Sequence, residues 1–190
     1  MSLYLRTKNN LPKEIFQDME KQFPPEEMKS FEEFNKLFEK TPYKCEILFD
    51  AKSTVGYILY LENEYLWVDY VAIFREFHSK GYGSKIFEIL FEKYSQLKGV
   101  FFEVEPENQE NMQTIKRMNF YKKLGCKNLN FNYYYPNDIK KLKMELLFKP
   151  LKEDLPNKNE ILNQISFVFE SLHSNVKSKN ETLELIKTNN

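Results

Sequence analysis

The 190-residue chain has only five glycines, two cysteines, one tryptophan and no surplus of charge of either sign. Its 28 basic residues balance 28 acidic ones, so we expect no basic surface for nucleic acid and no polybasic segment for an anionic membrane. No apolar run approaches the roughly 20 residues that span a bilayer. The N-terminus lacks the charged-then-apolar pattern of a signal peptide, so we expect a cytoplasmic protein with neither nucleic acid nor membrane as a partner.

The two cysteines, Cys45 and Cys126, lie far apart, and neither belongs to a CxxC motif. Each adjoins an apolar, strand-like run. This arrangement favours two reduced thiols in the core over a disulfide or a metal site, and we expect no metal. The basic residues are almost all lysine, and asparagine, isoleucine and phenylalanine are plentiful, which is typical of an AT-rich, bacterial genome.

The residue patterns predict an α+β fold with a mixed, mostly antiparallel sheet of about six to seven strands, flanked by helices, and an added C-terminal helix. We expect one domain over residues 1–150, followed by a linker, a docked helix and a frayed polar tail over 151–190, with His173 at the surface. The predicted strands are residues 4–7, 45–49, 55–61, 65–74, 100–104, 126–135 and 142–148. The predicted helices are residues 11–23, 84–97, 111–124 and 161–172, and one that starts at the capping box Ser30-x-x-Glu33 and ends before Pro42.

Two of the five glycines fall in the stretch His78-Ser79-Lys80-Gly81-Tyr82-Gly83. An apolar strand pattern precedes this stretch, and an amphipathic helix pattern follows it. Glycine lets a backbone approach a phosphate closely, and the first N–H groups and the positive dipole end of the helix then point at it. The stretch lacks the third glycine of a dinucleotide fingerprint and the spacing of a Walker A loop. It predicts a site for a phosphate-bearing cofactor.

Three motifs together resemble the GNAT superfamily of acyl-CoA-dependent N-acyltransferases, in particular a bacterial subgroup of unassigned substrate. They are Val71-Ala72-Ile73, His78-x-x-Gly81-x-Gly83 and Asn119-Phe120-Tyr121-Lys122-Lys123-Leu124-Gly125-Cys126. The order of predicted elements matches the family over residues 4–148. His78 stands where the family usually has Arg or Gln, and Cys126 stands where it usually has Phe. The resemblance implies a GNAT-like fold and acetyl-CoA as co-substrate.

The resemblance also implies which residues hold the cofactor. The backbone amides of Val71 and Ile73, on either side of Ala72, would hold the pantetheine arm as an added strand, although both side chains could equally be plain core. The diphosphate would rest on the loop and the helix start that follow. At the family's asparagine position, seven residues before the motif tyrosine, stands Thr114. The loop residues implicated are His78, Ser79, Lys80, Gly81, Tyr82, Gly83 and Ser84.

Acyl transfer to an amine requires a neutral nucleophile, so a base must take a proton from the ammonium. Asp69 is the one carboxylate inside its own otherwise apolar strand, and alternation predicts that it shares a face with Val71 and Ile73. It is either the base, an anchor for the substrate ammonium, or an ordinary hydrogen-bonded strand residue. Glu103, in the next apolar strand, is a candidate relay base. Tyr121 matches the family position whose phenol protonates the leaving thiolate, or it simply packs on its helix.

The acceptor site is less defined. In the resembled family the loop between the first two helices lines it, which makes Glu26 and Glu27 candidates for recognising a cationic substrate, or surface acids at a helix start. Tyr133, within a run of three tyrosines, either walls the acceptor pocket or packs as a strand residue.

These residues together predict an N-acetyltransferase that moves an acetyl group from acetyl-CoA to a primary amine by direct attack, without a covalent enzyme intermediate. The acceptor would be a small molecule or a peptide. The alternative is a non-catalytic module that senses acyl-CoA. A homodimer formed through strand edges is compatible with the pattern.

Overall fold

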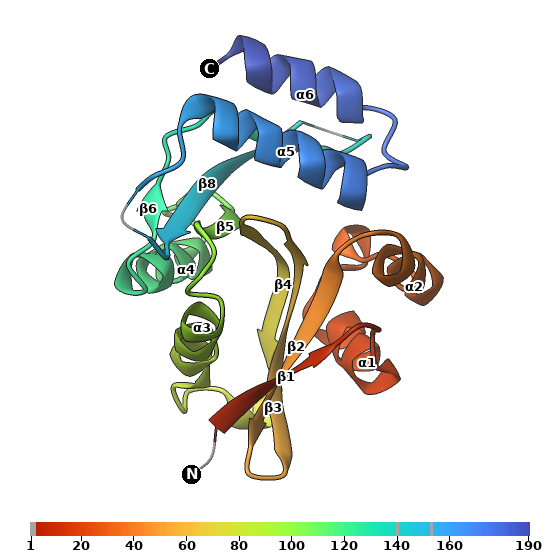
Figure 1. Ribbon diagram of the computed structural model, residues 1–190, viewed down its shortest axis with the longest axis vertical. Helices are drawn as coiled ribbons and strands as arrows, with labels where there is room; N and C mark the ends of the chain where they lie inside the picture. The colour runs from red at the N-terminus through yellow and green to blue at the C-terminus, as the bar shows by residue number, and fades with distance from the viewer. Residues whose placement is uncertain (1–2, 140, 153) are drawn as a thin grey trace. The chain divides into compact units, whose positions relative to one another are not determined.

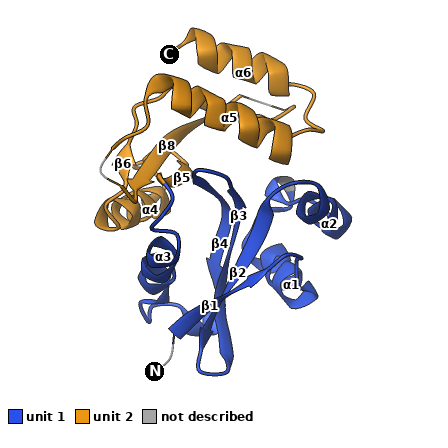
Figure 2. Ribbon diagram, in the orientation of Figure 1, with its two compact units in different colours: residues 1–97 blue, residues 98–190 orange. Residues whose placement is uncertain are grey.

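The computed structural model describes residues 3–139, 141–152 and 154–190. The chain forms two compact units, residues 1–97 and residues 98–190 (Figure 2). Strands and helices are mixed along the sequence, which confirms the expected α+β class. The expected division at residue 150 stays a prediction.

The first unit is built on an antiparallel sheet in the order β1-β2-β3-β4 (Figure 1). The predicted strands are confirmed, each with one to three residues added or removed at its ends. The β2–β3 hairpin turns between Asp50 and Ser53, which are paired in register. The elements of this unit are β1 (Leu3–Lys8), α1 (Lys13–Gln22), the 3-10 turn η1 (Pro25–Glu27), α2 (Phe31–Lys40), β2 (Tyr43–Asp50), β3 (Ser53–Glu62), β4 (Leu66–Ile73), the 3-10 turn η2 (Arg75–Phe77) and α3 (Tyr82–Lys93).

Helices cover both faces of this sheet, with α1 and α2 on one side and α3 on the other (Figure 1). Neighbouring residues of β3 demonstrate the two faces, because side chains alternate along a strand. The Tyr57 hydroxyl donates to Asp18 of α1 over 2.9 Å, whereas the Tyr60 ring lies 5.6 Å from that of Tyr94, just after α3. Strand β3 is therefore buried on both sides, which explains its nearly continuous apolar sequence.

A buried carboxylate ties α3 to the sheet. Glu46 of β2 is fully buried, and its Oε1 accepts hydrogen bonds from Thr7, Tyr60, Tyr94 and Lys93 at 2.6–3.1 Å. The ammonium of Lys93 supplies the compensating charge that a buried carboxylate requires. The C-terminal end of α3 is thereby fixed, and its N-terminal end carries the glycine loop.

Strand β4 contains an irregularity where it pairs with β3. Leu59 pairs with Tyr70 and Tyr60 pairs with Val68, so that Asp69 is an extra residue with no opposite partner. Such a β-bulge shifts the alternation of side chains by one position. Residues of β4 before and after Asp69 therefore do not follow one continuous alternation between the two faces of the sheet.

Both ends of the predicted helix 84–97 differ from expectation. Helix α3 starts at Tyr82 and ends at Lys93. Gly99, which follows the predicted end of this helix by two residues, is the first residue of strand β5. A Cβ there would lie 2.1 Å from Cζ of Phe148, so close packing against the neighbouring strand explains the glycine.

The capping box of Ser30 and Glu33 at the start of α2 is confirmed, with both reciprocal hydrogen bonds present.

In the second unit, β8 pairs antiparallel with β5, β6 and β7. The single strand expected over 126–135 is wrong, because the chain leaves the ladder after Asn128 and rejoins it at Tyr133. Asn130 adopts a positive φ of 51° within this break. The elements of this unit are β5 (Gly99–Val104), α4 (Met112–Lys123), β6 (Lys127–Asn128), β7 (Tyr133–Tyr135), β8 (Leu142–Pro150), α5 (Lys158–Leu172) and α6 (Lys179–Thr188).

The C-terminal segment corrects two expectations. The tail past His173 is not frayed but forms α6, which buries Thr182 and Ile186 and packs on α5 and β7. His173 is not at the surface: it is 3% exposed, and its ring packs edge-on against Tyr135 at 4.9 Å. Helix α6 covers this region, and its two buried side chains are too few to stand out in a polar sequence.

The two thiols are free and buried, as predicted. Burial raises the pKa of Cys126 to about 12, so this thiol stays protonated at neutral pH. Across the described ranges, no helix is long and apolar enough to cross a membrane.

Candidate active site

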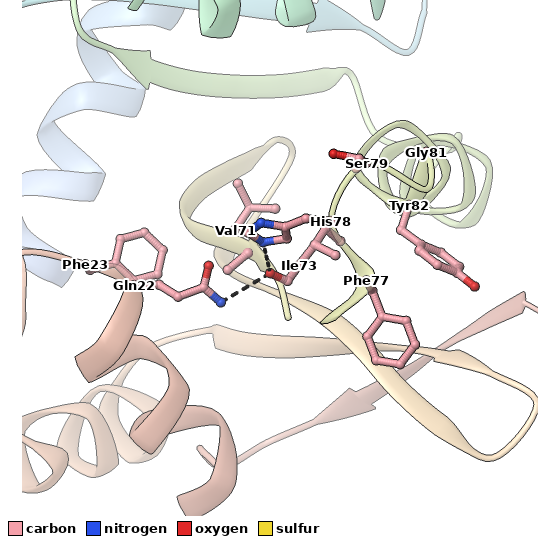
Figure 3. A pocket seen from close by; sticks show the side chains of 11 residues that line it. Gln22, Phe23, Val71, Ile73, Phe77, His78, Ser79, Gly81 and Tyr82 are labelled. Atoms are coloured by element: carbon pink, nitrogen blue, oxygen red, sulfur yellow. Dashed lines mark hydrogen bonds between the residues drawn. The ribbon is translucent and has the colours of Figure 1, made fainter. Parts of the chain in front are cut away.

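A pocket of about 400 Å³ lies in the first unit, where β4 ends and the chain turns into α3 (Figure 3). The pocket brings together three segments: the end of α1, the end of β4, and the glycine loop. Most of the residues expected to hold a cofactor line it, but Lys80, Ser84 and Thr114 do not. The lining consists of Gln22, Phe23, Val71, Ala72, Ile73, Phe77, His78, Ser79, Gly81, Tyr82 and Gly83.

The loop backbone suits an anion. Gly81 has φ +80°, a left-handed conformation that glycine adopts without steric cost. It is followed at once by α3, whose first helical bond runs from Lys85 N–H to the Gly81 carbonyl over 3.3 Å. The N–H groups of residues 82–84 precede that bond and have no helical acceptor. They and the positive end of the helix dipole favour a negatively charged ligand.

Side chains around the loop add positive charge and fix its position. Lys80 is exposed and donates to the Glu76 carbonyl over 2.9 Å, with its ammonium 5.2 Å from the Phe77 ring centre. The Tyr82 hydroxyl donates to Asp50 over 2.5 Å, and this hydrogen bond raises the pKa of Tyr82. The first residue of α3 is thereby attached to the β2–β3 hairpin.

The end of β4 is held by two side chains. The carbonyl oxygen of Ile73 accepts hydrogen bonds from Gln22 Nε2 at 3.2 Å and from His78 Nε2 at 2.7 Å. His78, expected to contact a diphosphate, thus also binds the strand that precedes its own loop. The sequence pattern indicated nothing for Gln22, since the last turn of an amphipathic helix contains many polar residues of no special role.

Asp69 is not on the face expected for it. Its Oδ2 accepts from the Tyr43 hydroxyl at 2.6 Å and lies 3.9 Å from Lys29 Nζ. The Tyr43 ring packs 5.1 Å from Phe38 of α2, so the carboxylate faces the α1–α2 side of the sheet. The expectation that Asp69 shares a face with Val71 is wrong, because the bulge at Asp69 interrupts the alternation. Burial and the nearby Asp69 charge raise the pKa of Tyr43, which therefore keeps its proton.

The loop between α1 and α2 also contacts β4. The Tyr70 hydroxyl donates to the Glu27 carbonyl oxygen, and the Tyr70 ring meets Phe23 edge-on at 5.1 Å. Glu27 is exposed. Glu26 belongs to η1, but its side chain lies outside the described part of the chain.

The remaining predicted residues belong to the second unit. Tyr121 of α4 is 7% exposed, its ring lies 4.8 Å from that of Phe102, and burial raises its pKa. Glu103 and Tyr133 are brought together, since the Tyr133 hydroxyl donates to Glu103 Oε1. The Thr114 hydroxyl donates to the Asn111 carbonyl over 2.8 Å, which stabilises the first turn of α4.

No group of three or more His, Cys, Asp or Glu side chains is placed to hold a metal ion in the described part of the chain. The pocket instead offers backbone N–H groups and small loop residues. This set suits a phosphate-bearing ligand that lies along β4, and it fits the phosphate and amide groups of acetyl-CoA.

Comparisons with known proteins agree with this geometry. The chain is 25% identical over 165 residues to the Bacillus subtilis (strain 168) protein named "Putative acetyltransferase YjbC", covering 84% of this chain and 81% of that protein. Among solved structures, a "Putative acetyltransferase from GNAT family" of Bacteroides thetaiotaomicron superposes with a TM-score of 0.72 at 23% identity, covering 90% of this chain and 99% of that one. A Bacillus subtilis acetyltransferase solved in complex with CoA gives a TM-score of 0.58 at 14% identity, covering 80% and 100%.

The two structural likenesses establish the fold. The model of the acetyltransferase (GNAT) family matches residues 10–125, which is more than half of the chain and includes β4, the glycine loop and α4. The chain therefore belongs to the GNAT family of acetyltransferases.

Proposed function

We propose that this protein acts in the cytoplasm and transfers an acetyl group from acetyl-CoA to a primary amine of a small molecule or peptide, by direct attack of the amine on the thioester. One observation carries the proposal: in a chain of the GNAT family, the pocket joins the end of β4 to the unpaired N–H groups that start α3. The CoA complex of a Bacillus subtilis acetyltransferase of the same fold supports acetyl-CoA as the co-substrate.

The cofactor would be held mainly by backbone. We assign the diphosphate to the N–H groups of residues 79–84, with Lys80 as a nearby side-chain donor and His78, whose Nε2–H is taken by the Ile73 carbonyl, at the edge of the site. The pantetheine arm would lie along β4 at Val71, Ala72 and Ile73, with its amides bonded to the strand as an added strand would be. Thr114 is assigned a supporting contact from α4.

Bound acetyl-CoA supplies an activated carbonyl carbon with a thiolate leaving group. The amine must first lose a proton, because most primary amines are protonated at pH 7. Asp69 Oδ2 is the candidate base or ammonium anchor, and the hydrogen bond from Tyr43 orients this carboxylate. Glu103, held by Tyr133, is the candidate relay. We propose these roles in that order because Asp69 belongs to the same strand as the proposed pantetheine site.

Tyr121 is the candidate general acid. A tyrosine phenol, whose ordinary pKa is about 10, carries its proton at neutral pH and could donate it to the sulfur as the carbon–sulfur bond breaks. The acceptor would approach from the α1–α2 loop, where Glu26 and Glu27 would attract an ammonium, with Tyr133 as an aromatic wall.

Binding is tested first. CoA at 100 times its dissociation constant should stabilise the protein by about 2.7 kcal/mol, which is a rise in melting temperature of roughly 5–10 °C. Absence of any shift with millimolar CoA or acetyl-CoA would contradict the proposal.

Transfer is tested by thiol release from acetyl-CoA with a panel of amines. Tyr121→Phe should lose most turnover and keep its affinity for CoA, because it lacks only the donated proton. Tyr4→Phe, on β1, serves as the matched control and should keep both. Binding of acetyl-CoA without transfer to any amine would instead favour the sensor.

A further inference from the structure

The carbonyl oxygen of Ile73, at the edge of the pocket, accepts hydrogen bonds from two side chains. Gln22 Nε2 and His78 Nε2 both donate to its oxygen, at 3.2 and 2.7 Å (Figure 3). All three residues line the pocket. A carbonyl oxygen has two lone pairs, so this oxygen has no acceptor capacity left for a ligand. Its role is therefore to receive support and not to bind a ligand.

The side-chain amide of Gln22 is itself oriented by a hydrogen bond to Asp18. Gln22 Nε2 donates to Asp18 Oδ2 over 2.6 Å, and the same oxygen accepts from the Tyr57 hydroxyl over 2.9 Å. Asp18 is 9% exposed and Tyr57 is fully buried. Burial and the Asp18 charge raise the pKa of Tyr57, which keeps it a donor. Both N–H groups of Gln22 are used, one by Asp18 and one by Ile73, so the orientation of the amide is fixed.

His78 closes the other side. Because a carbonyl oxygen only accepts, Nε2 of His78 must carry the proton in this hydrogen bond. The bond joins His78 to Ile73, five positions earlier, so that the residues on either side of η2 are hydrogen-bonded to each other. The glycine loop that follows His78 therefore starts from a fixed point on β4.

We propose that Gln22, backed by Asp18 and Tyr57, and His78 form a clamp on the Ile73 carbonyl that sets the angle between β4 and the glycine loop, and that Gln22 is a positioning residue for CoA. This inference rests on the proposed function. In the proposed complex CoA binds through two parts, a pantetheine arm on the strand and a diphosphate on the loop. A fixed angle lets both ends bind at once, which multiplies their separate affinities.

The clamp makes a specific claim about fragments. Pantetheine uses only the strand, and adenosine 3′,5′-bisphosphate uses only the loop, so neither needs the angle. Calorimetric titration, direct or by competition, should compare both fragments with CoA. In Gln22→Leu, the dissociation constant for CoA should rise about tenfold, while those of the two fragments change less than about twofold.

Two further variants separate positioning from direct contact. Asp18 and Tyr57 do not line the pocket, so Tyr57→Phe acts only through the clamp and should weaken CoA by about threefold. Gln17→Leu is the matched control, since Gln17 is an exposed residue of the same helix, and it should bind CoA as the unmodified protein does. Melting temperatures measured in parallel confirm that each variant is folded.

Several results would overturn the clamp. One is unchanged CoA affinity in both Gln22→Leu and Tyr57→Phe. Another is an equal loss for CoA and both fragments, which would indicate general damage to the pocket. Failure of the unmodified protein to bind CoA would instead overturn the proposed function, and the clamp with it. The unmodified protein alone reveals this outcome, whereas failure of the clamp appears only when the variants are compared with it.

Discussion

Gly81 and Gly83, which lie two residues apart at the start of α3, should respond in opposite ways to the same added methyl group. Gly81 has φ +80°, and a Cβ built on it would meet no atom within 4 Å. Gly81→Ala therefore has room for the methyl group and loses only backbone energy. The left-handed conformation costs an L-residue about 1–2 kcal/mol, which is a fall in melting temperature of roughly 2–8 °C.

Gly83 lies in the first turn of α3 and lines the pocket. Alanine is the better helix former by up to about 1 kcal/mol, so Gly83→Ala should raise the melting temperature by roughly 2–4 °C. Its methyl group, however, takes space that we assign to the diphosphate. The affinity for CoA should therefore fall at least about tenfold, which corresponds to about 1.4 kcal/mol.

Thermal unfolding and CoA titration of both variants check these signs. Gly81→Asn is the control, because asparagine tolerates the left-handed region and should lose less stability than Gly81→Ala. The reasoning is refuted if both alanine variants shift the melting temperature in the same direction. It is equally refuted if Gly83→Ala binds CoA as tightly as the unmodified protein.

Three further changes test other parts of the structure. Two backbone N–H groups before α6 lower the pKa of Asp138, so its stabilising effect is full above its ordinary pKa of 3.8 and is lost as pH falls through the lowered pKa. The protection of α6 amides from hydrogen exchange, relative to their intrinsic rates, should fall there, and Asp138→Ala should remove this pH dependence. Lys93→Met leaves the buried Glu46 carboxylate without its cation and should destabilise the protein by about 2 kcal/mol in denaturant unfolding, less than for a fully buried pair because Lys93 is 34% exposed; no change would contradict this account. Gly99→Ala forces a methyl group against Phe148 and should cost about 1–3 kcal/mol in the same assay, so a neutral result would show that the strands can separate there without loss.

Local signals predicted the parts of the fold that depend on neighbouring residues. The Ser30 capping box and the glycine stretch after β4 each act within a few positions, and both are found where the sequence indicates. Helix α6 was missed because its buried face consists of two residues, Thr182 and Ile186, in a polar segment. Its stability comes from packing on α5 and β7, which no local pattern expresses.

The candidate site shows the same division. The loop residues followed from glycine chemistry, whereas Gln22 takes part through contacts with residues 51 positions away. The face of Asp69 was predicted wrongly because alternation assumes an uninterrupted ladder. Because this strand is apolar on both faces, its sequence has no polar–apolar alternation whose change of phase could reveal an extra residue.

The unmatched position at Asp69 also has a bearing on how this strand can evolve. Tyr60 already pairs with Val68 and Leu59 with Tyr70, so a chain without residue 69 could join the two halves of the ladder into one continuous run. Every other side chain would keep the side of the sheet it now occupies. Parity along the strand is thus independent of this single position, so selection on residue 69 acts through the hydrogen bond from the buried Tyr43 hydroxyl and through the role proposed for its carboxylate, and not through the alternation of the ladder.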